Sequence, residues 1–276
     1  MVFYSVGNPE VEVTRECQDN AREDAMAATD MTSAQAASNL AALLDGLAAQ
    51  DSNVRVDWAC RELSHGIETR QWEYDIASIR HRLTEYFSTD MVWAKSAATR
   101  VLLALANGGH FNYEDYLIFR AWYVTEEDTR GFVADVGPIM AVGNGAEYVE
   151  TCVRLGLIPA LEGAAIISCR LRAAGGVWHD AEGVRLAHVA CTVIGKSTSP
   201  HVLEVWSTRL ADTVLNEAVR HGNRAVIENF THFLNATGRI VRTEPEQWGI
   251  STERAKFAQS LISGLEEQLR SASGGC

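Results

Sequence analysis

Apolar residues recur at every third or fourth position along almost the whole chain, and this spacing limits the fold more than any other feature of the sequence. A helix places residues at that spacing on one face, whereas a half-buried strand needs strict alternation of apolar and polar residues. Clean alternation is nearly absent here, and Ala, Leu, Glu, Arg and Gln dominate, which favours helix. We therefore expect an all-α protein built from about a dozen short-to-medium helices.

Capping residues and glycines predict where several of these helices begin and end. Asn112, with an acidic residue three positions later, predicts the start of one helix. Thr125, followed by two glutamates, predicts the start of the next helix, and the run Gly143-Asn144-Gly145 predicts its end. We expect a polar loop over residues 238–249.

The first residues differ from the rest of the chain, because short apolar pairs and triplets flank the turn signal Gly7-Asn8-Pro9. We expect residues 1–13 to form an extended arm and residues 14–276 to form one helical domain. The break at Gly175-Gly176 leaves open a division into lobes 14–174 and 177–276, although the connections are short and no linker composition is present. The apolar arm residues are candidates for self-association: Val2, Phe3, Tyr4, Val11 and Val13.

Net charge and hydropathy exclude several classes of function. The chain has 24 Lys and Arg against 36 Asp and Glu, a net charge of −12, which argues against a passive polycation for duplex nucleic acid or an anionic membrane. No apolar run approaches the roughly 18 residues that a membrane span needs. The N-terminus reaches Glu10 before any long apolar segment, so it is not a secretory signal. We expect a cytoplasmic protein, or one within a particle assembled there, with no membrane partner and with its six cysteines reduced.

Two segments resemble known motifs. Residues 190–197 resemble a Walker A phosphate loop with Ala in place of the first Gly, but such a loop follows a strand of a parallel sheet, and no series of strands is predicted. We interpret Lys196 as a loop lysine. Residues 213–238 resemble a single ankyrin unit, but no second unit follows at the repeat length, so an ordinary helix–turn–helix is expected. No sequence signature of a catalytic serine, a catalytic cysteine or a zinc protease is present.

A metal site is the main catalytic alternative. On one continuous helix, two Glu/His pairs at i, i+4 spacing fall within about 60° of one face, which resembles half of a carboxylate-bridged di-metal bundle. The intervening Gly222-Asn223 is a helix stop that separates the pairs, and Glu/His pairs also stabilise solvated faces. We expect no cofactor. The ligands of the alternative are Glu217, His221, Glu228 and His232.

Arginine outnumbers lysine by 21 to 3. Arginine is the residue that interface ion pairs and bidentate phosphate contacts favour. An arginine that follows an apolar run needs a partner, which is a carboxylate of its own fold, a carboxylate of a neighbour or a phosphate. The arginines that are candidates for contact with single-stranded RNA are Arg80, Arg82, Arg100, Arg120, Arg170 and Arg172.

These features favour a non-enzymatic, self-associating structural protein of the coat or nucleocapsid kind. Arms exchange between neighbouring subunits in such assemblies, and interface cores are enriched in arginine and aromatic residues and depleted of lysine. Its expected partners are copies of itself and single-stranded RNA. Two alternatives remain: a helical-bundle metal enzyme or small-ligand binder that uses the Glu/His pairs, and an adaptor scaffold of helical hairpins.

Overall fold

The computed structural model describes residues 35, 37–173, 175–179 and 181–273. Its chain divides into two compact units, one from Met1 to Leu43 and one from Leu44 to Cys276. In the first unit the described residues are helical. The predicted arm, with Val2, Phe3, Tyr4, Val11 and Val13, lies outside the described residues.

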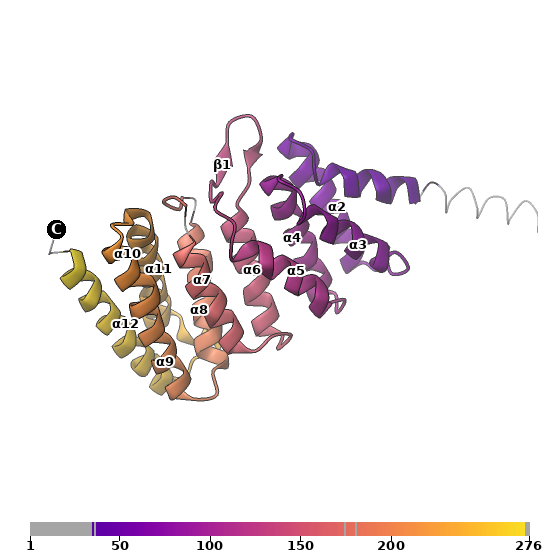
Figure 1. Ribbon diagram of the computed structural model, residues 1–276. Coiled ribbons are helices and arrows are strands. Elements are labelled where there is room, and N and C mark those ends of the chain that lie inside the picture. The colour runs from indigo at the N-terminus through magenta and orange to yellow at the C-terminus, as the bar shows by residue number, and fades with distance from the viewer. Residues whose placement is uncertain (1–34, 36, 174, 180, 274–276) are drawn as a thin grey trace, which may run out of the picture. The chain divides into compact units, whose positions relative to one another are not determined.

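Within its described residues the second unit is built from helices, connecting loops and one short hairpin, so the all-α prediction is confirmed for the described part of the chain (Figure 1). The unit contains π-helical segments η1 and η2 and a 3₁₀ turn η3 in addition to its α-helices and two strands. In chain order the elements are η1 (Asn53–Cys60), α2 (Arg61–Glu68), α3 (Ile76–Tyr86), α4 (Val92–Asn107), α5 (Tyr113–Tyr123), β1 (Phe132–Val133), β2 (Gly137–Pro138), α6 (Ala141–Arg154), α7 (Ala160–Arg172), α8 (Glu182–Lys196), α9 (Pro200–Leu210), η2 (Ala211–Leu215), α10 (Asn216–Arg220), α11 (Arg224–Thr243), η3 (Pro245–Trp248) and α12 (Thr252–Ser273).

Helices α6 and α8 form the centre of the second unit. Helix α6 packs against α4 and α8, while α8 also packs against α7 and α11, and α11 packs against α12. The sequence explains why α8 is central, because nearly every residue from Leu186 to Ile194 is apolar and buried. None of the described helices combines the length and the apolar character that a bilayer crossing needs.

The predicted start of α5 is confirmed. The Asn112 side chain accepts hydrogen bonds from the backbone N–H groups of Glu114, at 2.9 Å, and Asp115, at 3.1 Å. These two groups have no partner within the first turn of the helix, so the cap satisfies them. The helix break predicted at Gly222-Asn223 is also confirmed, since α10 ends at Arg220 and α11 begins at Arg224.

The helix predicted from Thr125 to residue 142 is wrong. Residues 126–130 have no regular secondary structure. The Glu126 carboxylate accepts hydrogen bonds from Trp122 Nε1, at 2.6 Å, and Lys95 Nζ, at 3.2 Å, and so binds the chain after α5 to these two helices. The antiparallel hairpin β1–β2 follows, with Phe132 paired to Pro138. The same carboxylate that favours a helix start is thus used to bind side chains of α4 and α5.

The glycines at 143 and 145 lie inside α6 and do not end a helix. A Cβ atom on Gly145 would lie 2.1 Å from Cε2 of Tyr123, so glycine at this position allows α6 to approach the ring closely. The loop predicted over 238–249 is also shorter than expected. Helix α11 continues to Thr243, because Ile240 and Val241 bury their side chains in the core.

Candidate functional site

Four of the six candidate arginines either bind other parts of the chain or lie outside the groove described below. Arg80 forms an ion pair with Asp115 across α3 and α5. Arg82 binds Glu85 at 2.8 Å and Asp45 at 2.9 Å. Ion pairs of this kind satisfy the guanidinium group inside the molecule.

Arg170 is buried, with 1% of its surface exposed, and its partners are main-chain carbonyls. Its Nη1 donates to the carbonyl oxygen of Tyr123, and its Nη2 donates to those of Glu126 and Ala173. The group thereby fastens the end of α5 and the following loop to α7. It has no surface that a ligand could reach, so it takes no part in the proposals below. Arg100 is exposed on α4 and does not line the groove described next.

Arg120 and Arg172 come together with Arg209 at the rim of a groove of about 650 Å³ between α5, α7, α9 and η2. We call it the arginine-rimmed groove. Its floor is made by small residues of α7, and two apolar side chains stand exposed beside it, Leu161 at 57% and Val205 at 37%. Further lining residues are Pro159, Glu162, Ala164, Ala165, Ser168, Cys169, Trp206 and Thr213.

The charge of this rim is only partly compensated. Arg120 Nε lies 3.6 Å from Oε1 of Glu162. Within the residues that the structure describes, neither Arg172 nor Arg209 has an ion-pair partner. An apolar floor between free guanidinium groups is suited to a ligand that presents apolar side chains together with carboxylates or phosphates.

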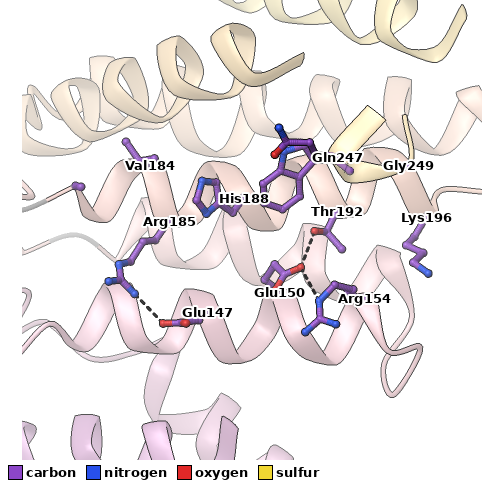
Figure 2. A pocket seen from close by; sticks show the side chains of 12 residues that line it. Glu147, Glu150, Arg154, Val184, Arg185, His188, Thr192, Lys196, Gln247 and Gly249 are labelled. Atoms are coloured by element: carbon purple, nitrogen blue, oxygen red, sulfur yellow. Dashed lines mark hydrogen bonds and ion pairs between the residues drawn. The ribbon is translucent and has the colours of Figure 1, made fainter. Parts of the chain in front are cut away.

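A second hollow, which we call the polar cavity, has a volume of about 830 Å³ and lies between α6, α8 and η3 (Figure 2). Helix α6 contributes Glu147, Glu150 and Arg154, and helix α8 contributes a stripe at three- and four-residue spacing. Both sets lie on single helix faces, because residues three, four or seven apart share a face. The stripe of α8 is Val184, Arg185, His188, Thr192 and Lys196, and Ala181, which directly precedes the helix, also lines the cavity.

One ion pair and one hydrogen bond join the α6 and α8 walls of the polar cavity (Figure 2). Arg185 Nη1 donates to Oε2 of Glu147 at 2.7 Å. Oε1 of Glu150 lies 3.3 Å from Arg154 Nε and accepts a hydrogen bond of 3.1 Å from the Thr192 hydroxyl. Lys196, at one end, makes no ion pair within the described residues. These contacts hold α6 and α8 at a fixed separation.

The third wall is aromatic. The rings of His188 and Trp248 lie 4.9 Å apart between centroids, at an interplanar angle of 35°. The turn η3 reaches this position because residue 195 of α8 is glycine: a Cβ atom there would lie 2.0 Å from the carbonyl oxygen of Trp248. Burial lowers the pKa of His188, an effect that the nearby Glu150 opposes. Burial therefore favours the neutral form of the ring.

The four residues of the metal alternative do not form a ligand set. Helix α10 ends before His221, and the turn at Gly222, with φ of +64°, separates Glu217 from Glu228 and His232. Among the residues that the structure describes, no group of three or more His, Cys, Asp or Glu side chains could hold a metal ion. Residues 190–196, which resemble a phosphate loop in sequence, lie within α8.

Sequence reasoning missed the polar cavity, although its two stripes of polar residues on otherwise apolar helices are a signal that could have identified it. A helix that is buried on most of its surface has a polar stripe only where that stripe meets solvent or another polar group. The partner helix and η3 could not be assigned without the fold. A search with protein-family models, with curated proteins and with solved structures finds no match to this chain.

Proposed function

We propose that this chain is a non-enzymatic structural subunit that self-associates, as coat and nucleocapsid subunits do, by docking residues 2–13 of one copy in the arginine-rimmed groove of another. The observation that supports this proposal is the groove itself. It presents an apolar floor and three guanidinium groups, and two of these have no ion-pair partner within the described residues.

The sequence of the N-terminal segment complements the groove in charge and polarity. Residues 1–16 contain three glutamates, Glu10, Glu12 and Glu16, and one arginine, so their side chains have a net charge of 1 − 3 = −2. Two of these glutamates alternate with the apolar residues Val11 and Val13. A segment with this pattern places carboxylates on the arginine rim and apolar side chains on the floor, which is how charge and apolar contact combine at interfaces.

The chain between the arm and the first described helix is long enough to reach another copy. Residues 14–34 lie between them, and a segment of 21 residues spans up to about 70 Å when extended. A docked arm from a neighbour makes a heterologous contact, in which one surface of each copy meets a different surface of the next. Contacts of this type generate rings or open filaments.

The oligomeric state tests the proposal. We expect light scattering coupled to size exclusion to show oligomers of the full chain whose mass rises with protein concentration. Deletion of residues 2–13 and the double substitution Arg172→Glu/Arg209→Glu should both reduce the mass to that of the monomer. A matched control is Arg239→Glu/Arg242→Glu, which reverses two exposed arginines of α11 outside the groove and should leave the mass unchanged.

Circular dichroism checks that each variant keeps its helical content, so that loss of association is not loss of fold. A full chain that stays monomeric at all concentrations would overturn the proposal and favour an adaptor scaffold. Groove variants that associate as strongly as the parent protein would contradict the assignment of the groove.

A further inference from the structure

We infer that the polar cavity between α6, α8 and η3 is a binding site for a ribonucleotide, either free or as one unit of single-stranded RNA. This inference deepens the proposed function, on which it rests for its biological setting, because a nucleocapsid subunit needs a nucleic-acid site as well as a self-association surface. Its chemistry rests on the cavity alone. The volume of about 830 Å³ is within the roughly 300–1,000 Å³ of known ligand sites.

One end of the cavity is suited to a phosphate group. Lys196 is exposed there and makes no ion pair within the described part of the chain. Arg154, on α6, places its Nε 3.3 Å from Glu150 Oε1 and donates from Nη2 to Thr151 and Asn107, which leaves Nη1 for a ligand. Over the whole cavity three cationic side chains face two carboxylates, which leaves one positive charge in excess. A phosphodiester carries one negative charge and balances it.

The aromatic wall is suited to a base. Trp248 and His188 present neighbouring rings along the cavity, and sequence-tolerant RNA binding commonly stacks bases on such rings. Burial favours the neutral form of the His188 ring, which lies against the indole and in that form does not repel the base amino groups. The wall lies close to α8, because the Trp248 carbonyl of η3 packs directly against Gly195.

The carboxylates between these ends are suited to the sugar. Glu147 and Glu150 lie along the cavity between the cationic end and Arg185 (Figure 2). A carboxylate accepts hydrogen bonds and donates none, so it pairs with the ribose hydroxyl groups and repels a second phosphate. The 2′-hydroxyl is the group that distinguishes RNA from DNA. The cavity therefore favours a ribonucleotide over a deoxyribonucleotide.

Binding of fluorescent single-stranded RNA and DNA of equal length and sequence, followed by anisotropy, tests this inference. Both the full chain and the variant without residues 2–13 are used, so that RNA binding is measured with and without self-association. We expect RNA to bind more tightly than DNA. Lys196→Glu should weaken RNA binding at least about tenfold, the change expected for loss of one charge-assisted contact. Lys256→Glu, an exposed lysine of α12 outside the cavity, is the matched control and should bind like the parent.

Competition with adenosine or uridine monophosphate distinguishes the two sources of the ligand. Displacement of RNA by the free nucleotide supports a site for one unit of an RNA strand. Binding of the nucleotide without binding of RNA supports a site for a free ribonucleotide. If neither binds, if DNA binds as tightly as RNA, or if Lys196→Glu and Lys256→Glu behave alike, the inference is wrong.

Discussion

Two buried guanidinium groups show how single residues join distant parts of this chain. Arg55 is 1% exposed and donates to the carbonyl oxygens of Val136, at 2.8 Å, and Pro138, at 3.0 Å, in addition to two carbonyls that precede η1. Arg170 uses three carbonyls in the same way. Burial lowers the pKa of both side chains, yet arginine stays protonated in proteins, so each acts as a fixed set of donors.

The contact between Gly145 and Tyr123 gives a prediction at the scale of one residue. The Tyr123 ring cannot retreat, since its hydroxyl donates to the Val142 carbonyl oxygen at 2.8 Å and its ring stacks on Phe119. We expect Gly145→Ala to lower the free energy of unfolding by about 1–3 kcal/mol, the range for overpacking a filled core. Urea unfolding followed by circular dichroism measures this change.

Gly264 on α12 is the matched control, because a Cβ atom there has no neighbour within 4 Å. Gly264→Ala should be neutral or should raise the free energy of unfolding by up to about 1 kcal/mol, through the higher helix propensity of alanine. Equal effects of the two substitutions would contradict the close approach of α6 to Tyr123.

At the scale of elements, the sequence predicts helices well where local signals decide them. Helix α5 begins where the Asn112 cap places it, and the turn at Gly222 separates α10 from α11 as predicted. The prediction fails over residues 125–142, because Glu126 is committed to partners on α4 and α5 that lie far away in sequence or on the preceding helix. Local sequence signals do not contain information about such tertiary contacts. Gly145 predicts a helix end for the same reason, although its role is to let α6 approach Tyr123.

The candidate sites were less predictable than the helices. Arg120 and Arg172 could be named from composition, but their meeting with Arg209 depends on the packing of α7 against α9. The polar cavity draws on helices about 40 residues apart and on a turn about 60 residues further along the chain. Its stripes are visible in the sequence, whereas their pairing depends on the fold.

The packing of η3 on α8 gives a pH prediction. Burial holds the pKa of His188 below its ordinary value of 6.5. The charged groups that face it are Glu147 and Glu150 of α6, Arg185 of its own helix and Glu244 before η3. The unfolded chain takes up a proton at this residue at higher pH than the folded protein, so the free energy of unfolding should decrease as the pH falls below about 6.5.

Chemical unfolding between pH 7.5 and about 5 measures this decrease above the range in which carboxylates titrate. His188→Gln should remove part of the pH dependence in this window. His201→Gln, at an exposed position of α9, is the control and should keep the dependence of the parent. If His188→Gln keeps the full pH dependence of the parent protein, another group is responsible for the decrease in the free energy of unfolding.

At the scale of the whole molecule, a net charge of −12 makes copies repel one another at long range. Association then requires a local surface of opposite charge, and the arginine-rimmed groove provides one for the acidic N-terminal segment. Screening by salt weakens both interactions, and the two changes have opposite effects on association. Salt weakens the general repulsion between copies and also weakens the attraction between arm and groove, so the charges of the arm and groove are best tested by reversing them in matched pairs.

Charge reversal on both partners distinguishes docking between copies from docking of the arm on its own subunit. Glu10→Arg/Glu12→Arg and Arg172→Glu/Arg209→Glu each place like charges against one another, so each variant alone should be monomeric. Mixed together, the native arm of the second meets the native groove of the first, and the reversed arm meets the reversed groove. We expect the mixture, but neither protein alone, to form oligomers that contain both variants in equal amounts, measured by light scattering and native mass spectrometry. If the mixture stays monomeric while one chain carrying all four substitutions resists proteolysis of its arm as the parent does, the arm docks on its own subunit.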